Sequence, residues 1–377
     1  MQEDIWARLQ SIDTVAGLHD AAASVAGTTE LREGGEPLDA PEEQSETSPR
    51  QSRRASSGFL QRNSVQVQLI LAIALVSIGF GVLYPDQFAT FRNFENITRQ
   101  GATLVVVAVG QTFALIVGGF DVSVGSTMGL SSTVGALVMV EYGTIAGVLA
   151  GLGAGLAVGL VNGFLIARLG VTPFVATLGM LAFARGLANQ ISDGASVSGF
   201  PESFRFFGGG SWGPIPATVG IAAVVVLIAG VVLYLSRFGL HLYGIGGSRE
   251  ASVLSGIRVQ RVEFLAYTIC GLLAGVAGLM LASRVSVGQA SLGTGFELMS
   301  IATAVIGGVA IGGGIGRLSG VVLGVALLSV LSTGMNIAQV SEFIQQMVTG
   351  VVLVVAVLID RLRLRGSESR RLGALLE

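Results

Sequence analysis

Long apolar runs separated by short polar stretches fill the chain from residue 65 onward. Several approach the ~20 residues that an α-helix needs to cross a ~30 Å hydrocarbon core. They predict about ten spans, at 65–84, 100–118, 123–140, 144–167, 172–190, 214–236, 263–283, 297–312, 318–336 and 343–360. The third and eighth are short or interrupted by glycine, which is typical of broken or re-entrant helices. We therefore predict an all-α polytopic membrane protein.

The segments outside these spans have a different character. Residues 1–64 are rich in acidic residues, Ser, Gln and Pro, which predicts a largely disordered acidic cytoplasmic extension. Within it, the helical spacing of Ile5, Trp6, Leu9 and Ile12 indicates one short amphipathic helix. The membrane domain then occupies 65–365, and 366–377 form a cytoplasmic tail.

Composition agrees with a membrane protein, because 51% of the 377 residues are hydrophobic and 12% are charged, against about 25% charged in soluble domains. The 55 glycines point to helices that pack through small residues. Two glycine series at helical spacing predict packing faces: Gly147, Gly151 and Gly155, and Gly271, Gly275 and Gly278.

The distribution of arginine predicts the orientation, because cytoplasmic loops carry an excess of basic residues. All 22 basic residues are arginine. With the N-terminus inside, the interior holds Arg168, four arginines in 237–262, Arg317 and five in the tail, whereas the exterior holds Arg92, Arg99, Arg205 and Arg284. An even number of spans also places both termini on the cytoplasmic side.

Polar side chains within the spans are candidates for function, because each costs roughly 2.5–3.5 kcal/mol to insert if charged. The candidates are Gln111, Asp121, Asn162, Arg185, Asn189, Glu297 and Asn336. Hydrogen bonding between helices explains Asn162 and Asn336 as well as a role in transport does. For Asp121 and Arg185 we favour a position in a translocation pathway or an ion pair, and one hypothesis is that they pair with each other.

The stretch "GGFDVSVGS", residues 118–126, is the most informative of these positions. Gly118 and Gly119 are expected to end one helix, and Asp121 with Ser123 to cap the next. A helix break at membrane depth is tolerated when it is buried in protein or lines a watery cavity. The alternative is a plain cytoplasmic turn between two spans.

Several classes of chemistry are excluded. A P-loop requires a lysine, and the chain has none. The Gly-rich run "GGVAIGGGIG" at 307–316 joins two spans and resembles a phosphate loop only superficially. His19 and His241 are too far apart for a zinc-protease motif. We expect a transport protein that uses an external energy source, with no metal or cofactor bound by this chain and no nucleic acid partner.

The segment 237–262 is the longest basic loop on the predicted cytoplasmic side. After Gly246-Gly247-Ser248, the pattern of Glu250, Val253, Leu254 and Ile257 predicts a short helix that Gly256 ends. Such a helix lying on the membrane face docks a soluble partner; the alternative is a linker with incidental helicity.

Four stretches in order resemble a known family: "VGQTFALIVGGFDVSVGS" (109–126), "GLVNGFLIARLGVTPFVATLGMLAFARGLA" (159–188), "YGIGGSREASVLSGIRV" (243–259) and "VGQASLGTGFELMSIATAVIGGVAIGGGIG" (287–316). Together they are similar to the permease subunit of sugar-importing ABC transporters, of the ribose/xylose/galactose type. The resemblance covers 65–365 and leaves the 64-residue extension unexplained.

This resemblance implies a bacterial inner-membrane, multi-pass protein whose two permease chains, expected to be a homodimer, form the pore. ATP and Mg would bind to a separate ATPase subunit, and an extracytoplasmic solute-binding protein would deliver the solute. The coupling loop to the ATPase would comprise Gly247, Ser248, Arg249, Glu250, Ala251, Ser255 and Gly256. Ser248 departs from the asparagine that the family often has.

The resemblance also implies a monosaccharide or similar small polar solute. The residues assigned to the pathway or the helix break are Gln111, Gly118, Gly119, Asp121, Ser123, Asn162, Phe174, Arg185 and Glu297. Three alternatives stay open: a branched-chain amino-acid type of ABC permease, a secondary transporter coupled to protons through Asp121 and Arg185, and a membrane scaffold that binds partners through its acidic extension.

Overall fold

The computed structural model describes residues 64–355 and 357–358. Within them the chain is mainly helical, with a single two-stranded antiparallel hairpin. The amphipathic helix expected near Ile5, the acidic extension and the tail after 365 lie outside the described residues.

The helices before the hairpin are α4 (Ser64–Leu83), α5 (Pro85–Phe88), α6 (Phe91–Ile116), α7 (Val124–Tyr142), α8 (Thr144–Ala167), α9 (Pro173–Ile191) and α10 (Glu202–Gly209). Strands β1 (Ser211–Trp212) and β2 (Ile215–Pro216) follow. The remaining helices are α11 (Ala217–Leu235), α12 (Arg237–Gly247), α13 (Arg249–Leu254), α14 (Val259–Val285), α15 (Phe296–Ile306), α16 (Leu318–Ile337) and a last helix at Glu342–Val355.

Seven helices of the described chain are long and apolar enough to cross a membrane: α4, α6, α8, α9, α11, α14 and α16. Each overlaps a predicted span. The helix α7 has 19 residues but is rich in Ser, Thr and Gly and is not among the seven. The eighth predicted span, 297–312, was too long, because α15 has only 11 residues and ends before Gly307 and Gly308, the latter at φ +85°.

Two further boundaries differ from the prediction. Helix α6 begins at Phe91 rather than near 100, because Thr90 caps it by accepting a hydrogen bond from the backbone N–H of Asn93 at 3.2 Å. The segment 237–262 contains two helices, α12 and α13, where only the second was predicted. Ser236 caps α12 by accepting from the N–H of Gly239.

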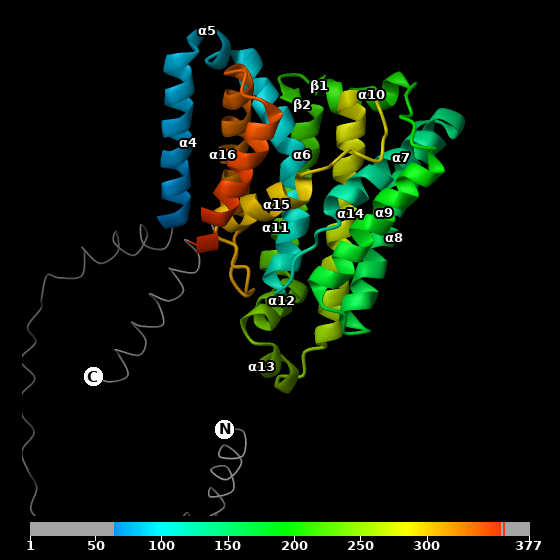
Figure 1. Cartoon of the computed structure of the whole chain (residues 1–377). Helices are drawn as coiled ribbons and strands as arrows, with labels where there is room; N and C mark the ends of the chain where they lie inside the picture. Colours follow the sequence, from blue (N-terminus) through cyan, green and yellow to red (C-terminus); the bar gives the residue numbers. More distant parts are fainter. Residues whose placement is uncertain (1–63, 356, 359–377) are drawn as a thin grey trace, which may run out of the picture. The chain divides into compact units, whose positions relative to one another are not determined.

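Helix α6 forms the centre of the packed helices, since 89% of its most apolar stretch is buried, against 6% for α4. Helix α14 packs against it, and helix α8 packs closely against the other side of α14 and against α7 (Figure 1). Their approach requires glycine, because a Cβ at Gly155 would lie 2.7 Å from Cα of Gly275. The predicted glycine packing faces are therefore confirmed, and they bring α14 close enough to α8 to build the site described below.

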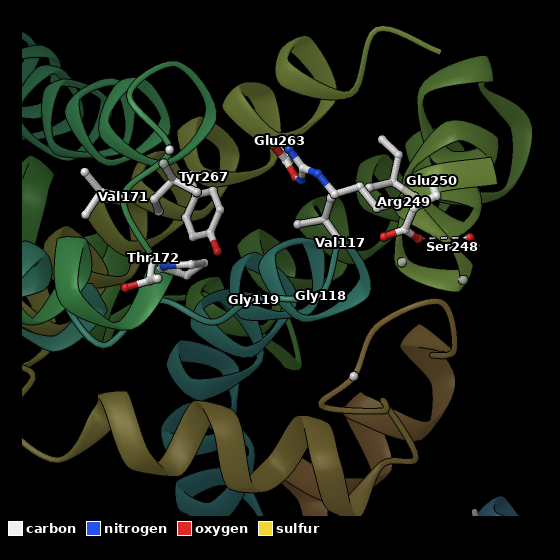
Figure 2. A pocket seen from close by; sticks show the side chains of 17 residues that line it. Val117, Gly118, Gly119, Val171, Thr172, Ser248, Arg249, Glu250, Glu263 and Tyr267 are labelled. Atoms are coloured by element: carbon white, nitrogen blue, oxygen red, sulfur yellow. Dashed lines mark hydrogen bonds and ion pairs between the residues drawn. The ribbon is translucent and has the colours of Figure 1, made fainter. Parts of the chain in front are cut away.

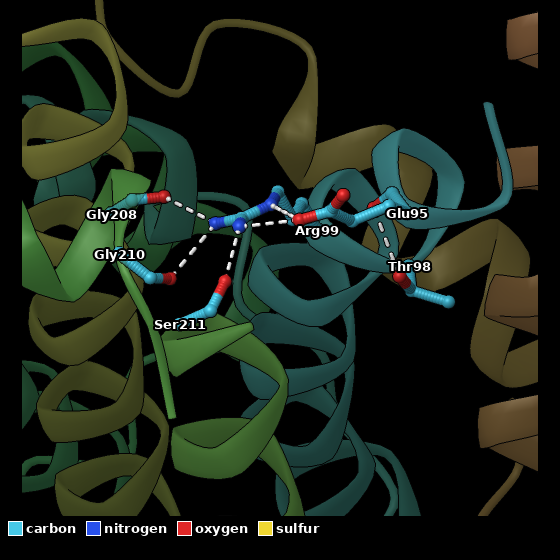
Figure 3. A network of polar contacts seen from close by, with 6 residues as sticks. All are labelled: Glu95, Thr98, Arg99, Gly208, Gly210 and Ser211. Carbon is cyan, nitrogen blue, oxygen red and sulfur yellow. Dashed lines mark hydrogen bonds and ion pairs between the residues drawn. The ribbon is translucent and has the colours of Figure 1, made fainter. Parts of the chain in front are cut away.

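The two ends of the helices carry different elements. Figure 1 shows α12 and α13 at one end and α5, α10 and the β-hairpin at the other. At the latter end, Arg99 of α6 donates to Gly208 O at 3.4 Å, to Gly210 O at 3.1 Å and to Ser211 Oγ at 2.8 Å (Figure 3). It also forms an ion pair with Glu95 at 2.6 Å, so one arginine holds the hairpin and α10 onto α6.

Candidate functional site

The stretch between α6 and α7 is a helix break buried inside the protein. After α6 ends at Ile116, Gly118 adopts φ +97°, which a residue with a side chain rarely adopts. The N–H groups of Gly118 and Gly119 donate to the carbonyls of Leu115 and Ala114 at 2.9 and 3.0 Å. These bonds satisfy carbonyls at the end of α6 and turn the chain towards Asp121.

Asp121 organises the start of α7. Its Oδ1 accepts from the backbone N–H of Ser123 at 2.7 Å and from the Ser123 hydroxyl at 2.6 Å. Its Oδ2 accepts from Asn162 Nδ2, on α8, at 3.1 Å. Only 1% of Asp121 is exposed, so these bonds replace the water that a carboxylate would otherwise require.

Gln111 completes the network from α6. The Gln111 amide is oriented so that its nitrogen faces the backbone carbonyl of Asp121. In this orientation Gln111 donates to Asp121 O at 3.1 Å and accepts from Asp121 N–H at 3.0 Å. Both groups of the Asp121 backbone are thereby bonded to one side chain. The structure thus brings together four residues that the sequence singled out: Gln111, Asp121, Ser123 and Asn162.

The hypothesis that Asp121 pairs with Arg185 is wrong. Asp121 is fully occupied by Ser123 and Asn162, and the Arg185 Nε and Nη2 atoms, on α9, are buried without a hydrogen-bond partner in the described part of the chain. Two other candidates also lie outside the network. Phe174 is half exposed and lies beside the ring of Phe120 at 6.0 Å, and Glu297 accepts from the N–H of Gly295 at 3.2 Å.

A cavity of about 530 Å³ lies next to the break, at the end of the molecule that carries α12 and α13 (Figure 2). Its walls come from the break, the α8–α9 connection, the end of α12, the start of α13 and the start of α14. Arg249 of α13 forms an ion pair with Glu263 of α14 across it. The Tyr267 hydroxyl is buried there without a hydrogen-bond partner among the described residues.

Helix α13 is short, capped and exposed. The Ser248 hydroxyl accepts from the N–H of Ala251 at 3.2 Å, so serine performs the capping that asparagine also performs. Gly256, at φ +77°, follows the helix, as the sequence predicts. Val253 and Leu254 are 58% and 89% exposed, which leaves an apolar tip on this helix without a partner in the described chain.

Three glycine-containing segments meet where α12 joins α13. The N–H of Gly314 donates to Ile116 O, at the end of α6, at 2.9 Å. A Cβ at Gly246 would overlap both Ile116 O and the Gly314 backbone, so only glycine fits there. The run 307–316, which the sequence indicated only as a connection, therefore packs directly against both the helix break and α12.

The sequence reasoning missed Glu263, Tyr267 and the contact made by Gly314. Glu263 lies at the start of a span, and an ionisable residue in that position is the signal that would have found it. Tyr267 and Gly314 carry no such signal, because a tyrosine and a glycine are ordinary in an apolar helix and a Gly-rich loop. No group of three or more His, Cys, Asp or Glu in the described chain is placed to hold a metal. The site offers hydrogen bonds, an ion pair and backbone contacts.

Comparison with known proteins decides the family. Residues 93–357 match the family described as "Branched-chain amino acid transport system / permease component". The chain belongs to this permease family. The match includes the break, α13 and the Gly-rich run, so all three lie within the region that the family shares. The family description names a permease component, so the chain is a transport component rather than an enzyme.

Curated relatives extend the similarity over most of the permease. The ribose import permease protein RbsC of Escherichia coli K12 is 37% identical over 313 residues, which cover 82% of this chain and 96% of RbsC. The L-arabinose transport system permease protein AraH of the same strain is 37% identical over 297 residues, 78% of this chain and 90% of AraH. The D-allose transport system permease protein AlsC is 36% identical over 292 residues, 77% and 90% of the two chains. No solved structure matches the permease.

Proposed function

We propose that this permease is the membrane-spanning subunit of an ABC importer that carries a monosaccharide or similar small polar solute into the cell. The observation that supports it is the similarity to permeases named for ribose, L-arabinose and D-allose over more than three quarters of the chain. The multi-pass helices place it in a membrane, which we assign to the bacterial inner membrane.

Helix α13 is the proposed contact with the ATPase subunit, on which ATP and Mg bind. Its exposed apolar tip of Val253 and Leu254 suits a groove on a soluble protein. Its first residue, Arg249, is tied to Glu263 of α14, and α14 packs against α8, α6 and α7. Movement of α13 on closure of the ATPase is therefore passed to the helices around the break.

The proposed ATPase contact also implies how the permease is oriented in the membrane and where its other partners bind. The end with α12 and α13 faces the cytoplasm, with both termini on that side, as the arginine distribution also indicates. The opposite end, with α10 and the β-hairpin, receives an extracytoplasmic solute-binding protein. A second permease chain, in a homodimer, completes the pore.

Substitution of Glu250 tests the coupling role. Glu250 is exposed in the first turn of α13, so Glu250→Arg is expected to uncouple ATP hydrolysis from solute uptake in vesicles reconstituted with the ATPase and the binding protein, while the permease stays folded. Glu202→Arg is the charge-matched control for folding and for association with the ATPase, because Glu202 is an exposed first-turn glutamate of α10 at the opposite end. Normal coupling in Glu250→Arg contradicts the assignment.

A branched-chain amino acid is the second candidate solute, and the family description favours it. Uptake of labelled ribose, arabinose and leucine by the same vesicles separates the two. A proton-coupled mechanism through Asp121 is disfavoured, because its carboxylate is buried and bonded on both oxygens. Uptake that survives loss of the ATPase but stops when a protonophore is added would reverse that conclusion.

A further inference from the structure

A cavity of about 570 Å³ opens between the end of α8 and the start of α14. Three of its lining residues are apolar, Phe164, Phe264 and Leu265, and two are arginines, Arg168 and Arg261. Figure 1 shows these helix ends on the side that carries α12 and α13. The cavity is thus lined by apolar side chains and two cations, at the expected cytoplasmic edge of the membrane.

A second cavity, of about 410 Å³, shares Arg168 and Arg261 with the first and extends towards α13. Its other lining residues are Arg249, Val253, Ile257, Arg258, Val259 and Gln260. Four arginines and no acidic residue therefore line the two cavities together.

The charges of three of these arginines are uncompensated within the described residues. Glu263 neutralises Arg249, whereas Arg168, Arg258 and Arg261 form no ion pair there. Glu250, in the first turn of α13, does not pair with them either, because its carboxylate accepts from the Ser248 hydroxyl at 3.4 Å and forms no ion pair there. Like charges brought together in this way favour an anion between them.

The fold fixes the arrangement of the arginines. Arg168 directly follows α8, and Arg261 lies in the first turn of α14. The two helices approach closely there, because a Cβ at Gly163 would lie 2.6 Å from Phe264 O. The two guanidinium groups therefore come from different helices whose separation is set by backbone contact.

We propose that the two cavities bind one anionic phospholipid of the cytoplasmic leaflet. Its phosphate lies between Arg168 and Arg261, and one acyl chain packs against Phe164, Phe264 and Leu265. A free phosphate ion would leave the apolar cavity empty, and an acidic protein surface does not supply a chain to fill it. Basic pockets between membrane helices on the cytoplasmic side are suited to such head groups.

The bound lipid links α8 to the start of α14 and lies beside α13. It holds the arginines together despite their mutual repulsion, so it stabilises the approach of the end of α8 to the start of α14, the helix that follows α13. This role is independent of which solute the permease carries.

Native mass spectrometry of the full-length permease tests the proposal, with phosphatidylglycerol and phosphatidylcholine of identical acyl chains as probes. The wild type is expected to retain phosphatidylglycerol preferentially. Arg168→Gln with Arg261→Gln should weaken that retention by about 25-fold, about fivefold for each arginine. Arg92→Gln with Arg205→Gln is the matched control, because it removes two exposed arginines outside both cavities.

Three results would overturn the proposal: equal retention of the two lipids, undiminished phosphatidylglycerol in the double variant, or inorganic phosphate that binds as tightly as the lipid. If the double variant retains the lipid as the wild type does but no longer copurifies with the ATPase, the arginines belong to the ATPase contact instead. Leu265→Gln supports the acyl-chain contact if it weakens retention of the lipid but not of glycerol phosphate. If the double variant does not fold, Arg168→Gln alone must show the fivefold loss, and full retention rejects the site.

Discussion

Asn162 Nδ2 donates a hydrogen bond to Asp121 Oδ2 at 3.1 Å, although 41 positions separate the two residues. The same nitrogen lies 2.9 Å from the Ser123 hydroxyl. All three residues are buried, and Asp121 is not among the residues that line the neighbouring cavity. The carboxylate therefore ties α8 to the helix break and shapes the backbone.

Replacing Asp121 separates this structural role from a role in the pathway. Asp121→Asn keeps an oxygen that accepts from Ser123, so we expect most solute uptake to remain. Asp121→Ala removes both carboxylate oxygens and leaves the buried donors of Ser123 and Asn162 unsatisfied, which should lower stability by about 1–3 kcal/mol. Thermal unfolding and vesicle uptake measure the two effects. A folded Asp121→Asn variant with little uptake would instead place the carboxylate in the pathway.

The contact between Gly119 and Tyr267 limits the space beside the break. A Cβ at Gly119 would overlap the Tyr267 hydroxyl and lie 3.0 Å from Pro173 Cγ. We expect Gly119→Ala to destabilise the permease by about 1–3 kcal/mol, measured by thermal unfolding. Tyr267→Phe removes a hydroxyl without a partner in the described chain and should be nearly neutral.

Combining the two substitutions provides a sharper measurement. Gly119→Ala with Tyr267→Phe should recover part of the lost stability, because the overlapping atom is gone. Gly312→Ala is the matched control, since Gly312 lines the same cavity and a Cβ there would contact nothing within 4 Å. Absence of any recovery would mean that Pro173 rather than Tyr267 limits the space.

The ion pair between Arg249 and Glu263 is expected to couple α13 to α14. The Glu263 side chain is 7% exposed and that of Arg249 is 56% exposed. Arg249→Ala leaves a buried carboxylate unpaired and should cost about 1–3 kcal/mol, whereas Glu263→Gln should cost less. The double variant should lose less than the sum of the single losses, by about 1 kcal/mol.

The ratio of ATP-driven uptake to ATP hydrolysis tests the same ion pair in a second way. Both single variants should reduce ATP-driven uptake relative to ATP hydrolysis, and the exchanged pair, Arg249→Glu with Glu263→Arg, should restore part of it. If the single variants are as tightly coupled as the wild type, α13 acts on the membrane helices through another contact.

We expect ionisation of Tyr243 to lower the stability of the permease at alkaline pH. Burial, together with the neighbouring Tyr234, raises the pKa of Tyr243 to about 12, and its hydroxyl donates to Gly316 O at 2.8 Å. Because the folded pKa lies above the unfolded value of 10.0, the contribution is complete below pH 10 and is lost as the pH rises towards 12. Unfolding temperatures at about pH 9 and about pH 11 should therefore differ less in Tyr243→Phe than in the wild type.

Hydrophobic runs predicted most of the helices well, because a span must be both apolar and continuous to satisfy its backbone in lipid. They overestimated the length of α15, because the helix ends at Ile306, before Gly307, although the residues beyond it stay apolar. They did not predict α10 or the hairpin, which form outside the spans. Arg99 holds these elements through backbone carbonyls of Gly208 and Gly210, and such contacts leave no pattern in the sequence.

The sequence predicted those site residues that are polar within an otherwise apolar span, because inserting a polar side chain into a membrane costs free energy. Asp121, Asn162 and Gln111 are polar among apolar neighbours, so each was conspicuous, and the structure joins them. Arg185 was equally conspicuous but lies elsewhere, because spacing along the chain does not determine which helices face each other. The pairing of Glu263 with Arg249 was missed for the same reason, because the two residues belong to different helices.

The meeting of Gly246, Gly314 and the Ile116 carbonyl has a mechanical consequence. Backbone contacts there contain no side chain that can change rotamer to absorb a displacement. If α13 moves as the proposed coupling requires, we expect the end of α12 to displace the end of α6 and the 307–316 run by a similar amount. One stiff junction of backbone, rather than a long chain of contacts, would then move three parts of the membrane domain together.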